Sequence, residues 1–327
     1  MSCWRKGAGS RRRFCPLTEL AGARDIAFCR EIAGRANANL LHAARLLPQS
    51  RQAFFFASYA AMRLIDDAVD DGFLVRPATD RAAARSEMLA AIDHWEAQCL
   101  GRAEEGPLPA PVQRALRRIV RISDLGDTPW RGLAEAMRRD ARETPMVEWE
   151  DFLAYASGAT VAPATIFIYL LAADPSEEGF RWRLPSPPEG YAEDLGIFCY
   201  LVHILRDLAK DAERSERLVT IPESLLRRAG IAKTELSEAV KQRDGRISIL
   251  AADLRERAAA HLVKGRGALA ELGPLIGRRE YLALKGLIRI YVSLFERFGT
   301  DFFEGMAAAP GLETALRAEL LVAEAEE

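Results

Sequence analysis

Cysteine is scarce in this chain of 327 residues, which has only five cysteines, odd in number and scattered along the sequence. No CxxC motif is present, and no cysteine stands at a zinc-like spacing from the four histidines. These absences argue against a disulfide-stabilised secreted domain and against a structural zinc site. We therefore expect a protein of a reducing compartment, the cytoplasm.

Long apolar runs are also absent. No apolar stretch of signal-peptide length lies near the N-terminus, and nowhere do about 18 uncharged apolar residues follow one another. The nearest approach, residues 156–173, is rich in small residues and contains Pro163. We expect no membrane-spanning helix and at most a peripheral contact with a membrane.

Neither sign of charge dominates the chain. The formal net charge is −2, and the only basic cluster is the short stretch from Arg11 to Arg13, which is typical of a solvated tail. Nucleic-acid binding therefore has no electrostatic support.

Glycine (23 residues) and proline (16 residues) are too few for a sandwich of short strands, whereas Ala, Leu, Arg and Glu dominate long stretches, as helix-forming residues do. The composition predicts an all-α protein. No Ser/Gly-rich linker divides it, so we expect one helical domain over residues 21–310. Residues 1–20 would form a flexible arm, and residues 311–327 a C-terminal helix with a solvated tail.

One local pattern occurs twice. In "FFFASYAAMRLIDDAVDD", helical spacing places Tyr59, Arg63, Asp66 and Asp70 on one face at steps of four, three and four. In "IFCYLVHILRDLAKDAERS", it places Tyr200, His203, Asp207 and Asp211 on one face at steps of three, four and four, with Arg206 beside the aspartate. Each helix thus carries an aspartate pair one turn apart, next to an apolar segment.

Two carboxylates one turn apart can reach one divalent ion, and Mg²⁺ prefers a few carboxylates together with waters and phosphate oxygens. Two such helices facing each other would form an acidic cleft that favours Mg²⁺ and a diphosphate, and the arginines would grip phosphate oxygens. A single aspartate pair is more often a solvated helix face. Two pairs in matching contexts favour the metal site.

The segments that carry these pairs resemble the squalene and phytoene synthase family, which joins two prenyl diphosphates head to head. "LLPQSRQAFFFASYAAMRLIDDAVDD" resembles the family's first segment, and "LVHILRDLAKDAERSERLVTIPESLL" resembles its second. "MRRDARETPMVEWEDFLAYASGATVAP" and "IRIYVSLFERF" are similar to two further segments. The resemblance extends from about residue 37 to about residue 303 and implies an isoprenoid-synthase-like helical bundle with a central cavity.

The resemblance also implies roles for individual residues. Diphosphate contact or catalysis would involve Tyr59, Arg63, Arg206 and Tyr291. Two or three Mg²⁺ ions would be held by Asp66, Asp70, Asp207 and Asp211. Substrate binding would involve Asn37, Asn39, Arg139, Ser157, Tyr200, His203 and Lys210.

Several of these positions depart from the family pattern. Asn37 and Asn39 stand where the family usually has serines, and Ser157 where it usually has a second tyrosine. Tyr200 and His203 replace a glutamine and an asparagine, and Lys210 replaces an acidic residue. Because histidine is a poorer partner for Mg²⁺ than an oxygen ligand, His203 and Lys210 can instead contact phosphate directly.

The resemblance implies condensation of geranylgeranyl or farnesyl diphosphate through a cyclopropyl diphosphate to a phytoene-like, squalene-like or dehydrosqualene-like product. No GxGxxG follows a predicted strand, which favours a product formed without reduction by NADPH, although squalene-forming members bind their reductant without that motif. Aromatic residues could line the cavity around the cation or could simply be core. The candidates for this lining are Phe54, Phe55, Phe56, Phe198, Phe302 and Phe303.

Two alternatives remain open at this stage. A family member without catalysis would bind prenyl lipids or serve in assembly, and a helical terpene cyclase or chain-elongating synthase would use similar aspartate pairs. For the main hypothesis, we expect Asp66→Asn and Asp207→Asn each to reduce turnover strongly without loss of stability, because an amide replaces a repelling carboxylate.

Overall fold

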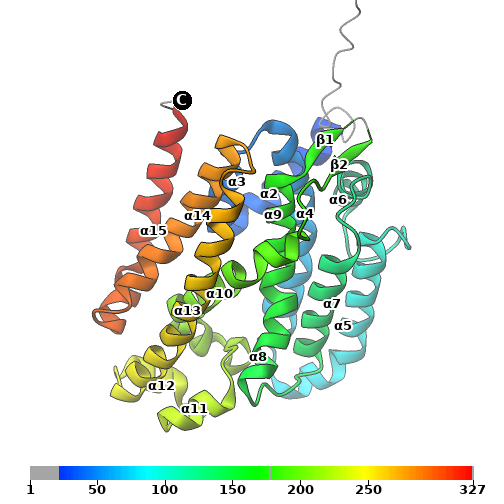
Figure 1. Cartoon of the computed structure of the whole chain (residues 1–327). Helices are drawn as coiled ribbons and strands as arrows, with labels where there is room; N and C mark the ends of the chain where they lie inside the picture. Colours follow the sequence, from blue (N-terminus) through cyan, green and yellow to red (C-terminus); the bar gives the residue numbers. More distant parts are fainter. Residues whose placement is uncertain (1–21, 177, 326–327) are drawn as a thin grey trace, which may run out of the picture.

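The computed structural model describes residues 22–176 and 178–325, with side chains described as far as residue 320. Within these ranges the chain is almost entirely helical, as the composition predicts, and forms one layered bundle (Figure 1). The arm expected over residues 1–20 lies outside the described residues, as do the last two residues of the expected tail.

The helices of the N-terminal half lead into the core. They are α2 (Ala23–Ala36), α3 (Asn39–Ala44), α4 (Gln49–Val69), α5 (Ala78–Cys99), α6 (Ala110–Ala115), α7 (Thr128–Ala141), α8 (Trp149–Ala156) and α9 (Ala162–Ala172). Wider π-helical turns extend three of them, namely η1 (Asp70–Leu74), η2 (Leu116–Val120) and η3 (Ser157–Val161). A short antiparallel hairpin follows, formed by β1 (Asp174–Ser176) and β2 (Gly179–Arg181).

The described C-terminal half adds six more helices to the bundle. Its helices are α10 (Pro188–Arg214), α11 (Glu223–Ala229), α12 (Leu236–Lys241), α13 (Gly245–Leu272), α14 (Arg278–Arg297) and α15 (Phe302–Ala325), with 3₁₀ turns η4 (Glu216–Leu218) and η5 (Lys233–Glu235) between them. Helix α15 runs through Pro310 without a break, so the described backbone shows no boundary at residues 310–311.

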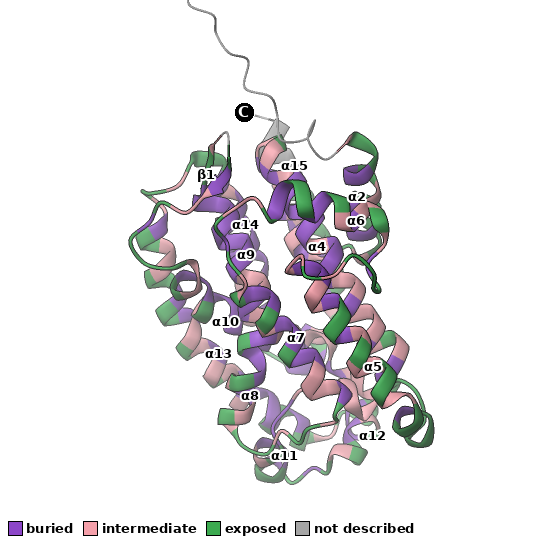
Figure 2. Ribbon diagram, turned by 90° about the vertical axis from the view of Figure 1, so that its right-hand side faces the viewer, coloured by how far each residue is buried: buried purple, intermediate pink, exposed green. Residues whose placement is uncertain are grey.

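Helix α4 is buried along most of its length because its residues between 53 and 62 are nearly all apolar or small. It packs against α2, α7 and α9. A helix that is apolar on all sides is stable only inside a core, and Figure 2 shows α4 and α9 as largely buried elements. The polar end of α4, from Arg63 onward, is where the helix leaves this core.

Helix α9 lies in the middle of the bundle and contacts both α4 and α10 (Figure 1). Together with α8 and η3 it forms a helical stretch, Trp149–Ala172, that is long and apolar enough to cross a membrane by length and composition. Of its most apolar window 61% is buried inside the molecule, as is expected of the core helix of a soluble protein.

The contact between α7 and η3 depends on two glycines. A Cβ added to Gly158 would lie 2.1 Å from the carbonyl oxygen of Gly132, so only glycine permits this approach. The approach fixes the rotation of η3, which decides the side of the bundle that each neighbour of Gly158 faces.

Candidate active site

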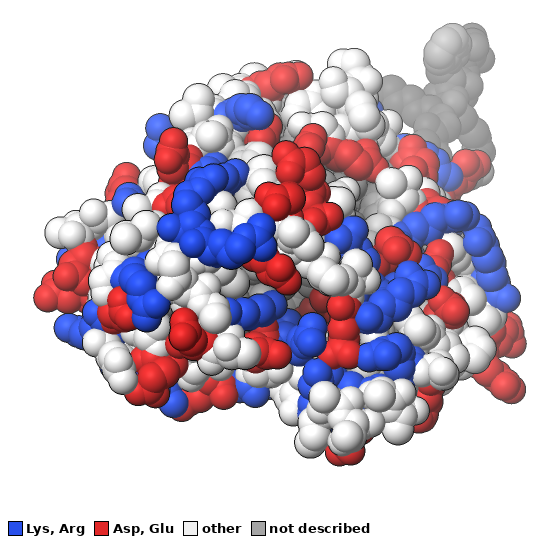
Figure 3. Space-filling view, turned by 90° about the horizontal axis from the view of Figure 1, so that it is seen from below, with Lys and Arg blue, Asp and Glu red and all other residues white. Residues whose placement is uncertain are grey.

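A cavity of about 350 Å³ lies between the polar end of α4 and the second half of α10. We call it the central cavity. Its other walls come from the start of α3, η1, α7, α8, η3, the start of α9 and the segment from η4 to Thr220. Figure 3 shows the face on which these helices end, where basic and acidic side chains mix around a hollow.

Most of the residues expected at the site line this cavity. From the first segment these are Tyr59, Arg63, Asp66 and Asp70, and from the second Tyr200, His203, Asp207, Lys210 and Asp211. The two aspartate helices therefore face one space, as the recurring pattern predicts.

Arg63 is held by carboxylates of its own helix. Its Nη1 lies 2.8 Å from Oδ2 of Asp66, and its Nη2 pairs with Asp67. Desolvation opposes the charge on Arg63, but the attraction of Asp66 and Asp67 outweighs it and raises the pKa of the guanidinium. Arg63 is thus a cation held in place beside the first aspartate pair.

The aspartates of this cavity crowd one another. Desolvation raises the pKa of Asp70 well above its usual value, and the neighbouring carboxylates of Asp66, Asp140 and Asp211 raise it further. The pKa of Asp66 is also raised, by desolvation first and despite the attraction of Arg63. Carboxylates that repel in this way are stabilised by a shared cation.

Asp207 has different surroundings, because protein cations already neutralise it. Nε and Nη2 of Arg206 donate to its two oxygens at 2.7 and 2.8 Å, and His203 Nε2 lies 3.0 Å from Oδ2. Burial opposes ionisation of Asp207, but these hydrogen bonds outweigh it and lower the pKa of the carboxyl well below its usual value.

Arg206 is in turn fixed from the far side by α15. Its Nη1 donates to Oε1 of Glu313 at 2.7 Å, and the same oxygen accepts from Nδ2 of Asn39 at 2.7 Å. Arg317 lies 3.8 Å from the other oxygen of Glu313. This buried network ties α3, α10 and α15 together directly behind the second aspartate pair.

The first aspartate pair fits a magnesium ion better than the second does. Among the described residues, no group of three or more His, Cys, Asp or Glu side chains converges closely enough to enclose a metal by itself. Mg²⁺ usually takes only one or two protein carboxylates and completes its shell with waters and phosphate oxygens. Asp66, Asp70 and Asp211 offer such oxygens, whereas both oxygens of Asp207 are engaged by Arg206.

Asp140 and Tyr155 also line the cavity and were not singled out from the sequence. The hydroxyl of Tyr155 donates to Oδ2 of Asp140 at 2.8 Å. Desolvation raises the pKa of Asp140 to about 7, although this hydrogen bond acts in the opposite direction. Both residues lie inside the segment "MRRDARETPMVEWEDFLAYASG". The only sign of their role in the sequence is that an aspartate and a tyrosine stand among apolar residues of predicted helices.

Ser157 does not line the central cavity, so the structure does not bring this residue together with the other residues expected at the site. It is exposed and borders a separate cleft, together with Gly132 and His261. The reason is the close contact between Gly158 and Gly132, which turns Ser157 outward and leaves Tyr155 facing the cavity. The residue of this segment that faces the central cavity is therefore Tyr155 and not Ser157.

The asparagines and Arg139 are also placed outside the cavity wall. Asn37 ends α2 in the left-handed conformation, and its Oδ1 lies 2.9 Å from His42 Nε2. Asn39 is buried and engaged with Glu313 and Arg317, while its neighbours Ala38 and Leu40 line the cavity. Arg139 is half-buried on α7 beside Asp140, which takes the cavity-facing position.

A smaller apolar pocket of about 130 Å³ continues the central cavity. The two share Leu40, Thr160 and Pro163. The pocket, called here the apolar pocket, is lined further by Ala164, Phe167, Ile168, Ala192, Leu195, Gly196, Cys199, Leu284, Leu287, Ile288 and Tyr291. Tyr291 thus lines this pocket. Burial, and to a smaller extent nearby Cys199, raises the pKa of its phenol, while the positive charge of Arg206 lowers it.

The phenylalanines considered as cavity lining belong to the core. Phe54 packs on Tyr169 and Phe180 with ring centroids 5.9 and 5.4 Å apart, and none of Phe54, Phe55 and Phe56 borders either space. The aromatic walls are instead formed by tyrosines in the central cavity and by Phe167 and Tyr291 in the apolar pocket.

An all-α bundle in which two aspartate-bearing helices face a cavity that leads into an apolar pocket defines the isoprenoid synthase class, and solved structures agree. The chain superimposes on a dehydrosqualene synthase in complex with ligand with a TM-score of 0.69 at 20% identity, covering 95% of this chain and 100% of that one. Against squalene synthase HpnC from Alicyclobacillus acidocaldarius the TM-score is 0.56 at 19% identity, with 91% and 95% covered.

The family is shown by sequence. The model of the squalene/phytoene synthase family matches residues 34–308, and the chain belongs to this family, whose activity is head-to-head prenyl transfer.

Two curated relatives are phytoene synthases. The chain is 23% identical over 214 residues to 15-cis-phytoene synthase from Synechococcus elongatus, a match that covers 65% of each protein. It is 28% identical over 215 residues to phytoene synthase from Cereibacter sphaeroides, a match that covers 64% of this chain and 55% of the relative. The matched region thus spans less than two thirds of either relative.

Proposed function

We propose that this protein condenses two molecules of geranylgeranyl or farnesyl diphosphate head to head, through a cyclopropyl diphosphate, to a phytoene-like, squalene-like or dehydrosqualene-like hydrocarbon. Family membership supports the reaction class. The observation that carries the proposal is the central cavity, where carboxylates and cations of α4 and α10 meet at the entrance of the apolar pocket. A diphosphate joined to an apolar tail matches these two adjoining spaces.

The cations at the cavity wall would bind and orient the diphosphates. Arg63 stands beside the first aspartate pair, and Lys210 and His203 line the wall on α10. Mg²⁺ ions, each held by one or two of Asp66, Asp70 and Asp211, would neutralise the diphosphate and assist its departure. Arg206 would act mainly by holding Asp207, because its guanidinium lies between that carboxylate and Glu313.

The walls beyond the diphosphates would protect an allylic cation from water. The rings of Tyr59, Tyr155 and Tyr200 line the cavity, and an aromatic face stabilises a nearby cation. The apolar pocket would hold a prenyl tail and exclude solvent from that side.

The test is incubation of the purified protein with radiolabelled geranylgeranyl diphosphate and farnesyl diphosphate separately, with and without Mg²⁺ and NADPH, followed by chromatography of the extracted lipids. We expect a Mg²⁺-dependent hydrocarbon of forty or thirty carbons formed without NADPH. Product formation that continues unchanged in EDTA would exclude the role given to Mg²⁺, and a strict need for NADPH would change the product assignment.

The same experiment separates the alternatives. Cyclic or head-to-tail products would indicate a terpene cyclase or a chain-elongating synthase. Tight binding of the diphosphates with recovery of unchanged substrate in every condition would indicate a prenyl-lipid-binding protein, and the engagement of Asp207 by Arg206 and His203 would then be the structural reason.

A further inference from the structure

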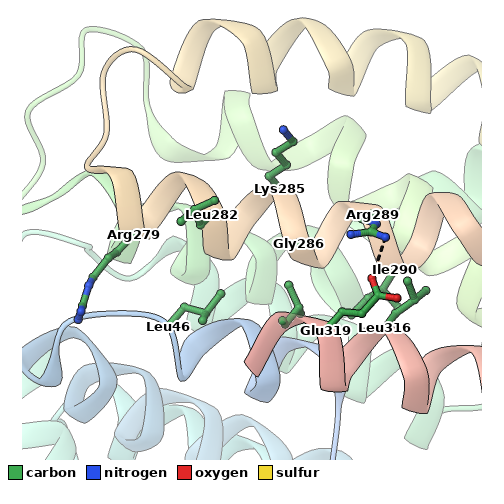
Figure 4. Close-up of a pocket in the computed structure, with 10 residues that line it drawn as sticks. Leu46, Arg279, Leu282, Lys285, Gly286, Arg289, Ile290, Leu316 and Glu319 are labelled. Atoms are coloured by element: carbon green, nitrogen blue, oxygen red, sulfur yellow. Dashed lines mark ion pairs between the residues drawn. The ribbon is translucent and has the colours of Figure 1, made fainter. Parts of the chain in front are cut away.

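An apolar groove of about 240 Å³ runs along the outer side of α14, between this helix, the end of α3 and α15. We call it the outer groove. Figure 4 shows Leu46, Leu282 and Leu316 around this space, with Arg279 at one end and the pair of Arg289 with Glu319 toward the other. Ile290 and Leu320 complete its apolar lining.

Gly286 lies in the wall of the groove between α14 and α15. A Cβ at this position would lie 2.1 Å from Cδ2 of Leu320, so glycine leaves room for the Leu320 side chain against α14.

The charges around the groove are mainly positive. Arg279, Lys285 and Arg289 are exposed on α14, and all three border the groove. Among the side chains that the structure describes, which end at residue 320, the only carboxylate at its border is Glu319, whose Oε2 already pairs with Arg289 at 2.7 Å. Along the first three turns of α14 the single acidic residue is Glu280, which is buried against Arg51 at 2.9 Å. Arg279 and Lys285 thus present uncompensated positive charge beside an apolar surface.

The opposite side of the same helix borders the apolar pocket. Leu284, Leu287 and Ile288 line that pocket, while Leu282, Lys285 and Ile290 line the outer groove. Only the thickness of α14 separates the pocket proposed for a prenyl tail from the molecular surface at the groove.

We propose that the outer groove docks this protein on a membrane surface by binding an anionic lipid, with an acyl chain along the leucines and the headgroup phosphate at Arg279 and Lys285. An apolar floor with basic side chains at its edge matches both parts of such a lipid, since long basic side chains reach the headgroup level. A second copy of the chain fits less well, because an antiparallel twofold contact through this surface would bring Lys285, which lies between Arg279 and Arg289 along the groove, toward its own counterpart. This inference does not depend on the proposed reaction.

The test is sedimentation of the purified full-length protein with vesicles of phosphatidylcholine alone and of phosphatidylcholine mixed with phosphatidylglycerol. We expect binding only to the mixed vesicles. Arg279→Gln and Lys285→Gln should each weaken it about fivefold, and the double variant about 25-fold, as expected for the loss of one and two basic contacts. Leu282→Ser, as a separate variant, should also weaken vesicle binding, because the substitution removes apolar surface from the groove.

Lys264→Gln is the matched control, since Lys264 is exposed on α13 away from the groove, and it should bind like the unchanged protein. Equal binding to both kinds of vesicle, no binding to either, or full binding by the double variant would overturn the proposal. Sedimentation velocity without lipid provides a further check, because a dimer that Leu282→Ser dissociates would assign the groove to a second copy.

Discussion

Asp66 and Asp207 occupy matching positions in the two repeated segments, but the structure gives them opposite electrostatic surroundings. Asp66 shares its surroundings with other carboxylates, whereas Asp207 is neutralised by Arg206 and His203. The sequence predicts equal behaviour when either is changed to asparagine. The contacts separate the two cases.

For Asp66→Asn we expect turnover to fall by about two orders of magnitude or more, because the proposed Mg²⁺ would lose a ligand. The free energy of unfolding should change by less than about 0.5 kcal/mol, because the weaker ion pair with Arg63 is offset by weaker repulsion from the neighbouring carboxylates.

For Asp207→Asn we expect the free energy of unfolding to fall by about 2 kcal/mol, because a charged hydrogen-bond acceptor of buried Arg206 disappears. Urea unfolding and single-turnover assays measure both; equal stability of the two variants would contradict the difference.

Asp140 predicts a pH dependence of stability. Its pKa of about 7 in the folded protein lies above the usual value of 3.8, so the folded state binds this proton more tightly than the unfolded state does. The protonated Asp140 therefore stabilises the folded state fully below about pH 4, and this stabilisation is lost as the pH rises through about 7.

Asp140→Asn should remove this loss. In buffer with EDTA we expect the variant to melt about 3 °C or more above the unchanged protein at pH 8 and to show no such advantage at pH 4. Thermal unfolding followed by circular dichroism across this range is the measurement. A constant difference between the two proteins at every pH would mean that the titration of Asp140 does not cause it.

At the scale of elements, α15 contributes to the site although the family match ends at residue 308. Glu313 on this helix accepts from Asn39 and Arg206, and its side chain is 9% exposed. The sequence predicts a C-terminal helix and a solvated tail over residues 311–327 but not these contacts, because a single glutamate in a helix of mixed composition gives no sign of its partners.

Glu313→Gln tests this contribution. The amide keeps the shape but loses the charge that holds Arg206, so we expect unfolding to cost about 2–3 kcal/mol less and turnover to fall with it. The matched control is Glu319→Gln on the same helix, whose exposed pair with Arg289 should contribute no more than about 0.5 kcal/mol. Urea unfolding compares the two, and equal effects would show that the buried network adds nothing.

The segment from α8 to α9 depends on a contact that its own residues do not reveal. Its small residues Thr160, Pro163 and Ala164 border the apolar pocket. The rotation of η3, however, is fixed by a contact with Gly132 on α7, a residue distant in sequence. For this reason the outward position of Ser157 could not be predicted.

At the scale of the whole molecule, the central cavity and the apolar pocket would limit the length of the prenyl tail if they hold the substrate as proposed. Ala164 borders the apolar pocket and is half-buried, so a larger side chain there would occupy part of the space. Ala164→Phe should reduce kcat/KM about tenfold more for geranylgeranyl than for farnesyl diphosphate, because only the longer tail would collide with the ring.

Ala164→Ser is the control, since it adds a single oxygen and should leave this ratio within about twofold. The ratio of the two kcat/KM values, measured for each variant by diphosphate release, is the readout. If Ala164→Phe impaired both substrates equally, the apolar pocket would not hold the end of the tail.

The sequence by itself determined the all-α fold and the two aspartate-bearing helices with Tyr59, Arg63, Tyr200 and His203 on the same faces as the aspartates. These features depend on composition and on spacing within one helix, which are local. The tertiary structure alone decided that Asp207 is neutralised, that Tyr155 and not Ser157 faces the cavity, that Asp140 and Glu313 belong to the site or support it, and that α14 separates a pocket from a surface groove. Each of these depends on contacts between residues far apart in the chain, because packing fixes the rotation of a helix and the partners of a buried charge.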